Sequence, residues 1–355
     1  MNKLTSKERI SRMYEHRDAD RVPITDVPWQ GAIVRWQNEG MPHNMDWRDY
    51  FNIDKIDGIS VDISPRYEQK VIEHTDEYTI VTSPWGVTMK NFNVPDSTPQ
   101  FLDFKVTGPR AWEEAKARMQ PDPSRIDWKY LEDNYNRWVQ EGSWLEACFW
   151  FGFDVSHSWM VGTEDFLVAL IEDPDWVKDV FETYLESCMV HFDMIWDAGY
   201  RFDGISWPDD MGYKGTPFFS PSTYRELLKP FHKRAVDWAH NKGIKARLHS
   251  CGYIEPLLDD ILETGIDALN PIEVKAGMDP LKLKELYGDR LLLHGGINAV
   301  LWDDKDKILE EIWKLVPELK KSGGYIFSSD HSIPSSVSLE NMKEIIAAVK
   351  EAGKY

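Results

Sequence analysis

The sequence predicts an α/β protein built as a (β/α)8 barrel, or TIM barrel, in a single domain that spans residues 1–355. Short apolar runs of β type recur eight times, and helix-length segments separate most of them. A length of 355 residues also suits one large barrel of this kind. In chain order, the eight predicted strands are 22–25, 58–63, 144–151, 202–206, 244–249, 266–270, 290–294 and 324–328.

Two of the predicted helices are marked clearly by their periodicity and their ends. Apolar side chains over residues 176–196 recur at helical spacing, and Gly199 follows as a stop signal. A second helix begins after Ser220 and ends before Gly243, in agreement with the preference for glycine after a helix. Pro230 lies inside this second pattern, so we expect a kink there.

The stretch at about 71–103, after the second predicted strand, breaks the alternation. Three β-type runs at 71–75, 78–82 and 87–90 are punctuated by Pro84 and Gly86. This pattern predicts a small β-meander inserted into the barrel. Insertions of this length commonly serve as a lid or an interface.

Composition limits the classes of partner. There are 60 Asp and Glu against 41 Lys and Arg, so the net charge of −19 disfavours nucleic acid and anionic membranes. No apolar run reaches the roughly 20 residues that span a bilayer, and the first residues lack the apolar core of an export signal. Three scattered cysteines do not predict a disulfide framework, so we expect a cytoplasmic protein and leave a homodimer open. The 16 tryptophans are expected mainly in the core, with some available to line a cavity for a flat apolar ligand.

Residues able to do chemistry recur where the predicted strands end. Active sites of such barrels lie at the C-terminal ends of the strands. The residues found there are Asp62, residues 149–154, Asp209, Asp210, His249, Cys251, Asn270, Glu273, His294, Asp330 and His331. We therefore predict an active site that draws on most of the strands.

The sharpest motif is R-L-H-S-C-G at 247–252. Because side chains alternate along a strand, His249 and Cys251 point to the same side, where they could bind one tetrahedral metal ion. The alternative is a hydrogen-bonded histidine beside an inert buried thiol. His331 is the predicted third ligand, because the last strand lies across the barrel mouth from the fifth. Its rivals are Asp330, Asp210 and Glu273. Sulfur and imidazole donors favour zinc.

The remaining candidates have weaker signals. Asp209 and Asp210 either orient a metal-bound histidine, act as acid or base, or cap a loop. Asp62 is either a buried carboxylate with a raised pKa or a helix cap. The expected substrate-binding residues, several of which could equally be core or turn positions, are Glu273, Asn270, His294, Trp207 and Phe151.

Several motifs together resemble one family over nearly the whole chain. They are D-R-V-P at 20–23, D-I at 62–63, S-P at 220–221, P-F at 230–231, G-G-I at 295–297, G-G-Y-I-F at 323–327 and L-E-N at 339–341. The chain is identified by them as a member of the uroporphyrinogen decarboxylase superfamily. That resemblance implies the barrel independently of the strand count.

Within this superfamily, the chain resembles the zinc-dependent, corrinoid-linked methyltransferases more than the true decarboxylase. The decarboxylase binds its acidic tetrapyrrole with an arginine-bearing N-terminal motif, and residues 24–32 here contain no arginine. The methyltransferases hold zinc with H-x-C after strand five and a cysteine after strand eight. The resemblance therefore implies His249, Cys251 and, in place of that cysteine, His331 as zinc ligands.

The function implied is methyl transfer between a small substrate and the cobalt of a corrinoid (cobalamin) protein. Zinc would act as a Lewis acid, and Asp210 would orient a ligand or the substrate. The substrate is expected to be a methoxylated aromatic, another methyl donor or a thiol. One alternative is a cofactor-free lyase that uses Asp62, and another is a non-catalytic corrinoid-binding or zinc-binding module.

Overall fold

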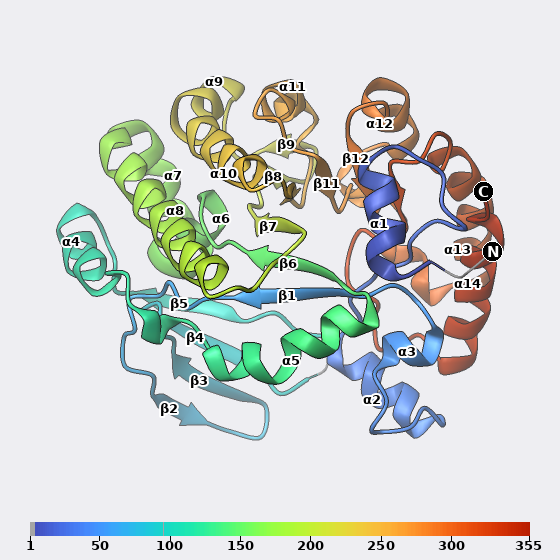
Figure 1. Ribbon diagram of the computed structural model, residues 1–355. Coiled ribbons are helices and arrows are strands. Elements are labelled where there is room, and N and C mark those ends of the chain that lie inside the picture. Colours follow the sequence, from blue (N-terminus) through green and yellow to red (C-terminus); the bar gives the residue numbers. More distant parts are fainter. Residues whose placement is uncertain (1–3, 95) are drawn as a thin grey trace.

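The computed structural model describes residues 4–94 and 96–355. Its centre is a curled, parallel sheet of seven strands, in the order β1-β6-β7-β10-β11-β12-β13 (Figure 1). The bounds are β1 (Ile56–Ser60), β6 (Trp144–Cys148), β7 (Gly204–Pro208), β10 (Lys245–His249), β11 (Ala268–Asn270), β12 (Leu292–His294) and β13 (Tyr325–Ile326). This arrangement is consistent with a TIM-like barrel, and it confirms seven of the eight predicted strands.

The first predicted strand, 22–25, is not a strand in the structure. It forms one parallel bridge, between Ile24 and Phe327 at the end of β13. Pro23 has no N–H to donate, and the N–H of Ile24 donates to the carboxylate of Asp54 at 2.8 Å. Because Pro23 lacks a donor and the N–H of Ile24 is bound to Asp54, the segment forms a single bridge and not a ladder of strand hydrogen bonds. The N–H of Asp54 still donates to the carbonyl of Ile24 at 2.9 Å, so the segment lies between β13 and the residues that lead into β1.

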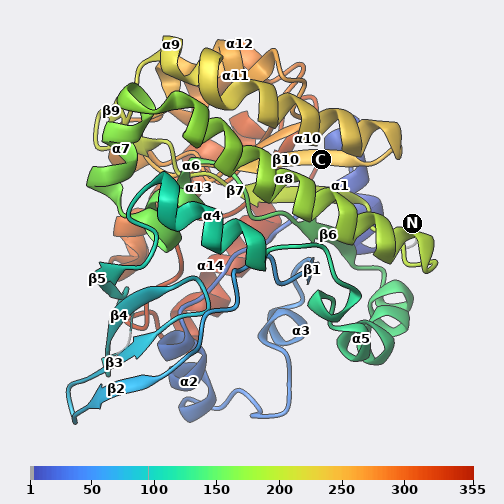
Figure 2. The same ribbon diagram turned by 90° about the vertical axis from the view of Figure 1, so that its left-hand side faces the viewer.

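Helices surround the curled sheet (Figures 1 and 2). Those before β7 are α1 (Ser6–Tyr14), α2 (Gln30–Asn38), α3 (Trp47–Phe51), α4 (Pro109–Arg118), α5 (Trp128–Glu141), α6 (Phe153–Ser156), α7 (Thr163–Glu172) and α8 (Pro174–Asp197). Those after it are α9 (Pro221–Thr223), α10 (Lys229–Asn241), α11 (Leu258–Leu262), α12 (Pro280–Tyr287), α13 (Lys305–Leu319) and α14 (Leu339–Ala352). Short helical turns are η1 (Pro123–Arg125), η2 (His157–Val161), η3 (Tyr224–Leu228), η4 (Glu255–Leu257), η5 (Val274–Ala276) and η6 (Ala299–Asp303).

The two predicted helices are confirmed in α8 and in the segment from α9 to α10. α8 ends at Asp197, and Gly199 follows with a φ of 99°, a backbone conformation that favours glycine. The second helix is not regular throughout. A π-helical turn, η3, joins α9 to α10 and places Pro230 in the first turn of α10, where its missing N–H costs little.

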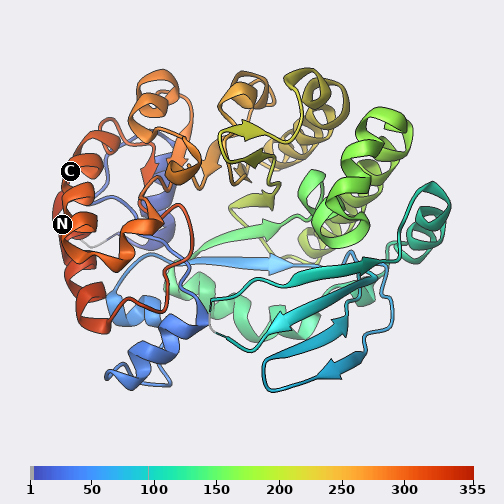
Figure 3. The ribbon, with the colours of Figure 1, turned by 180° about the vertical axis from the view of Figure 1, so that it is seen from behind.

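An antiparallel sheet of four strands projects to one side of the curled sheet (Figure 3). It consists of β2 (Val71–His74), β3 (Tyr78–Thr82), β4 (Val87–Phe92) and β5 (Gln100–Phe104). The three predicted runs of the insertion are therefore strands, and β5 is a fourth. A further two-stranded hairpin, β8 (Gly212–Tyr213) with β9 (Thr216–Pro217), follows β7.

The core between sheet and helices is strongly aromatic. Phe149, Phe151 and Trp207 are fully buried there, and the Phe149 ring stacks on Phe192 with 5.1 Å between centroids. None of the helices in the described part of the chain is long and apolar enough to cross a membrane.

Candidate metal centre

A cavity of about 790 Å³ opens at the C-terminal ends of the strands. Its walls include His249 and Cys251 from the end of β10, Asp210 from beyond β7, and His331 from beyond β13. A second cavity, of about 490 Å³, shares Asp210 and Cys251 with the first. These two residues therefore form a partition between two spaces.

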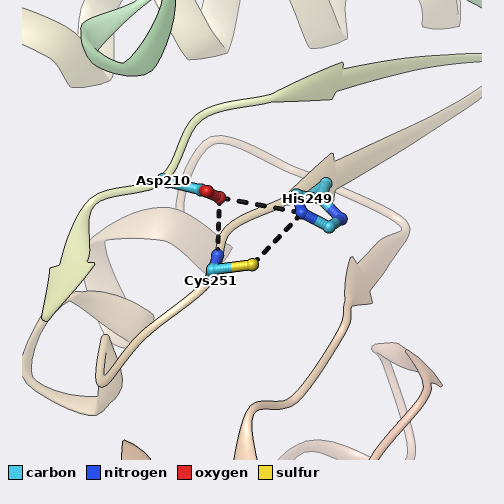
Figure 4. Close-up of side chains that lie close together, drawn as sticks. All are labelled: Asp210, His249 and Cys251. Atoms are coloured by element: carbon cyan, nitrogen blue, oxygen red, sulfur yellow. Dashed lines mark hydrogen bonds and ion pairs between the residues drawn. The ribbon is translucent and has the colours of Figure 1, made fainter. Parts of the chain in front are cut away.

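Asp210, His249 and Cys251 present one potential metal ligand each to a common point. Their ligand atoms all lie within 4.8 Å of one another, and this is the one such group of three or more found within 4–94 and 96–355. His249 Nε2 is 3.4 Å from Cys251 Sγ and 3.7 Å from Asp210 Oδ1 (Figure 4). One imidazole, one thiol and one carboxylate thus converge on a small volume.

The strand pairing brings these residues together. Pro208 of β7 lies opposite His249 of β10 in the parallel ladder, and the N–H of Asp209 donates to the carbonyl of His249 at 2.7 Å. The next carboxylate, Asp210, accepts a hydrogen bond from the N–H of Cys251 at 2.7 Å. Two loops that leave neighbouring strands are therefore fixed to each other at the point where the donors meet.

Two glycines make this close approach possible. The backbones of Gly212 and Gly252 pack against each other, so a Cβ added at Gly252 would lie 2.2 Å from the carbonyl carbon of Gly212. Gly252 also has a φ of 83°, in the left-handed region. A side chain at either position would push the loop that carries Cys251 away from the loop that carries Asp210.

The surroundings of Cys251 fit a bound cation. Burial raises the pKa of its thiol, and the carboxylates of Asp210 and Glu273 raise it further, so the thiol stays protonated beside these groups. A divalent ion would offset the carboxylates and favour the thiolate. Mixed sulfur, imidazole and carboxylate donors suit zinc better than magnesium or calcium.

The structure places His331 on the wall of the same cavity but outside the group of converging donors. Its side chain is exposed, and its ring lies 6.1 Å from the ring of Trp29. Asp210 is the residue whose ligand atom lies beside those of His249 and Cys251. The predicted pair H-x-C is thus brought together, with Asp210 and not His331 next to it.

Asp330 and Glu273 hold the loops of the site. Asp330 is buried and accepts hydrogen bonds from the N–H groups of Val274 and Ala299, at 2.9 and 2.7 Å. Glu273 accepts one from the N–H of Gly252 and lines the second cavity. Each carboxylate therefore joins two neighbouring loops at the mouth of the sheet.

Asp209 points away from the converging donors. It is fully buried, accepts a hydrogen bond from the N–H of Asp154 at 2.8 Å, and lies 2.7 Å from Nε2 of His232. His232 Nδ1 in turn lies 3.0 Å from the hydroxyl of Tyr224. The two adjacent aspartates thus have different surroundings, with Asp209 in a buried network and Asp210 at the cavity.

Asp62 lies outside both cavities. Although partial burial raises the pKa of its carboxyl group, hydrogen bonds from Ser64 and Arg66 outweigh this effect, so the pKa is lowered. The raised pKa that was one of the two expectations for Asp62 is therefore wrong. Its nearest partners are Ser64 at 2.6 Å and Arg66 at 2.6 Å.

Of the five predicted substrate-binding residues, Glu273 lines the smaller cavity, and the other four divide into two groups. Trp207 and Phe151 are fully buried in the core, with ring centroids 5.6 Å apart, and line neither cavity. Asn270 and His294 line the larger cavity, as does Arg247, which sequence reasoning did not single out. The sequence did contain a signal for Arg247: every second residue of a strand points to the same side, and Arg247 lies two residues before His249.

Asp154 and His157, at α6 and η2, form a further pair; from the sequence, Asp154 was included only within the range 149–154, and His157 was not identified. Both line the smaller cavity, with His157 Nε2 at 3.7 Å from Asp154 Oδ1. Burial, together with the charges of Asp210 and Asp209, raises the pKa of Asp154 to about 7. Burial lowers the pKa of His157 to about 4.

Comparison with known proteins identifies relatives for much of the chain. The family model described as "Uroporphyrinogen decarboxylase (URO-D)" matches residues 156–352, more than half of the sequence. The methylcobamide:CoM methyltransferase MtaA of Methanosarcina barkeri is 24% identical over 196 residues, which cover 54% of this chain and 54% of that protein. The uroporphyrinogen decarboxylase of Pelodictyon phaeoclathratiforme is 29% identical over 142 residues, 37% of this chain and 38% of that one. These alignments span about half or less of the relatives' own length.

Among solved structures, a methyltransferase from Methanosarcina mazei has the same fold. It superposes with a TM-score of 0.69 at 19% sequence identity, and the match covers 98% of this chain and 99% of that one. The likeness extends to the N-terminal part of the chain, which the family model does not reach.

Proposed function

Because the chain belongs to the uroporphyrinogen decarboxylase (URO-D) family, we propose that it is a zinc-dependent methyltransferase that moves a methyl group between a small substrate and a corrinoid protein. The curated relatives include a methylcobamide:CoM methyltransferase, which by its name acts on a methylated cobamide. We also propose that segment 22–25 takes the eighth position of the barrel, between β13 and β1, on the evidence of its hydrogen bonds to both sides.

The convergence of Asp210, His249 and Cys251 is the observation that carries the proposal. His249 and Cys251 would hold zinc, with Asp210 as the third ligand. His331, which lines the same cavity, is the alternative third ligand. Three protein ligands with an open position are typical of catalytic zinc, which when bound supplies a Lewis acid for the group undergoing transfer.

The larger cavity is the proposed substrate site. Its lining includes the apolar side chains of Val27, Pro28, Ile33 and Trp47 in addition to Asp210, His249 and Cys251. A volume of about 790 Å³ suits a small organic molecule. A cavity that has both apolar lining residues and a group of converging ligands favours a methoxylated aromatic compound over a polyanionic one. The corrinoid protein would approach the same mouth, since its cobalt must reach the methyl group.

The decarboxylase-like alternative finds less support in the geometry. Asp62, its proposed catalytic residue, lines neither cavity and is paired with Arg66. The two arginines that line the larger cavity already have carboxylate partners: Arg48 pairs with Asp46 and Asp57, and Arg247 with Glu146. Because both arginines are already paired with carboxylates, the cavity is a poor site for a substrate that carries several carboxylates.

The proposal is tested by methyl transfer to and from a free corrinoid. Zinc-loaded protein is mixed with methylcobalamin and a panel of thiols, or with cob(I)alamin and a panel of methoxylated aromatics, and the corrinoid spectrum is followed. We expect turnover with at least one compound, abolished by Cys251→Ala and retained by His43→Ala, a change at an exposed histidine. Zinc binding without turnover across both panels, with the natural corrinoid protein supplied as well, would contradict the enzyme and favour a binding module.

A further inference from the structure

We propose that Asn270 and Arg247 are positioning residues that fix the tautomer of His249, placing its proton on Nδ1 and leaving the lone pair of Nε2 to bind the metal. This inference rests on the proposed metal site. It assigns to Asn270 a role in presenting a ligand, in place of the substrate contact expected from the sequence.

The contact between His249 and Asn270 is the first step. His249 Nδ1 lies 2.6 Å from Oδ1 of Asn270, and the two residues are opposite each other in the β10–β11 ladder. An amide oxygen only accepts hydrogen bonds. If Oδ1 is the atom that faces the imidazole, the proton of a neutral His249 must therefore be on Nδ1.

The orientation of the Asn270 amide is the second step, and its other neighbours decide it. The Nδ2 group donates to the carbonyl of His294 at 2.9 Å, and Nη1 of Arg247 approaches Oδ1 at 3.5 Å. Exchanging Oδ1 and Nδ2 would set an oxygen against the carbonyl of His294 and an NH2 group against the guanidinium of Arg247. Both contacts would be repulsive, so the two neighbours fix the amide as described.

Arg247 is itself held in place. Its guanidinium makes two hydrogen bonds to Glu146 of β6, from Nε at 3.1 Å and from Nη2. Glu146 is buried, with 2% of its side chain exposed, and Arg247 retains 13%. A buried, two-point ion pair of this kind gives the guanidinium one orientation. Glu146 thus holds Arg247, Arg247 helps to orient the amide of Asn270, and this amide fixes the tautomer of His249.

The result is a free acceptor in the right place. With the proton on Nδ1, Nε2 of His249 has a lone pair, and that atom faces Cys251 Sγ and Asp210 Oδ1. Partners of this type behind a ligating histidine typically change metal affinity 10- to 100-fold when they are removed. The opposite tautomer would place a proton where the metal ion belongs.

The tautomer is measured directly in the metal-free protein. Long-range ¹H–¹⁵N spectra of ¹⁵N-histidine-labelled protein distinguish Nδ1–H from Nε2–H, and His249→Gln identifies the signals of residue 249. The spectra are recorded at about pH 8.5, above the usual histidine pKa of about 6.5. We expect the Nδ1–H pattern in the wild type. An Nε2–H pattern there would overturn the inference.

Two variants at one position separate positioning from a merely structural role. Asn270→Leu removes the acceptor and should shift His249 toward the Nε2–H form and weaken zinc binding about 10- to 100-fold. Asn270→Asp keeps an acceptor for Nδ1–H and should restore both. Equal zinc affinity in the wild type and Asn270→Leu, or an unchanged tautomer in Asn270→Leu, would refute the assignment. If Asn270→Leu does not fold, the wild-type and Asn270→Asp spectra still decide.

The two proposals fail in distinguishable ways. Absence of zinc binding in the wild type, with the Nδ1–H pattern present, would contradict the zinc site and leave the tautomer assignment standing. Zinc binding by the wild type, with an Nε2–H pattern in the metal-free protein, would support the zinc site and contradict the tautomer assignment. Arg247→Lys extends the test, since a lysine does not reproduce the two-point contact with Glu146 and should partly release the tautomer.

Discussion

Asp154 provides a prediction in which the pH dependence of stability reports on the charges around the candidate metal centre. Its side chain is 15% exposed and has no cationic partner within 4.0 Å in the described part of the chain except His157, whose pKa is lowered to about 4. The carboxyl group therefore ionises in a buried place beside Asp210 and Asp209, without a compensating charge. Asp154→Asn should relieve this cost in metal-free protein.

The magnitude follows from the pKa. It rises from about 3.8 to about 7 on folding, so the folded protein binds more protons than the unfolded chain between these values. The contribution of Asp154 to stability is therefore most favourable below pH 4 and is lost as the pH rises through 7. At about 1.4 kcal/mol per pKa unit, the difference in unfolding free energy between Asp154→Asn and wild type should grow by about 3 kcal/mol from pH 5 to pH 8.

Urea unfolding at pH 5, 6, 7 and 8 in the presence of a chelator measures this difference. Asp165→Asn, at an exposed position of α7, is the matched control and should show no such trend. Saturating zinc should flatten the trend for Asp154, since a bound cation favours the ionised carboxylate. If the difference in unfolding free energy between Asp154→Asn and wild type stays constant from pH 5 to pH 8 in the metal-free protein, the electrostatic reasoning is refuted.

Two further predictions use adjacent or matched positions. Asp209→Asn should lower the unfolding free energy by about 3 kcal/mol, because it disrupts a buried contact with His232, and it should leave the zinc content unchanged. Asp210→Asn should lose zinc with little change in the unfolding free energy. Elemental analysis and urea unfolding measure these effects, and the reverse result for the two variants would contradict the assignment. Gly252→Ala should lower the unfolding free energy by about 2 kcal/mol more than Gly215→Ala, and it should also lose zinc. Both glycines have a positive φ, but only at Gly252 would the added methyl group meet backbone atoms. Equal losses of unfolding free energy in urea denaturation would show that the close approach of the two loops is unimportant.

Most of the fold could be predicted because sheet and helices follow simple periodicities. Seven of the eight β-type runs are strands, and the meander and the two periodic helices are present. The exception at 22–25 depends on a long-range contact, in which the carboxylate of Asp54 accepts a hydrogen bond from the N–H of Ile24. A residue 30 positions away cannot be identified as that acceptor from local pattern.

The candidate site was predictable only where neighbours in sequence are also neighbours in space. His249 ends β10 and Cys251 follows two residues later, so the alternation of side chains along the strand, continued for two residues, placed both on the same side. The position of Asp210 depends on the loop packing at Gly252, which no local signal specifies. Trp207 stands next to polar loop residues in the sequence but is fully buried in the core, because its side chain faces the helices.

The zinc content of a small set of variants tests the central claim most directly. The wild type, His249→Ala, Cys251→Ala, Asp210→Ala and His331→Ala are purified with zinc supplied, and metal is determined by elemental analysis. We expect about one zinc per chain in the wild type and in His331→Ala, and loss in the other three. Zinc lost in His331→Ala and retained in Asp210→Ala would assign the third ligand to His331. Absence of zinc from the wild type would contradict the proposed metal site.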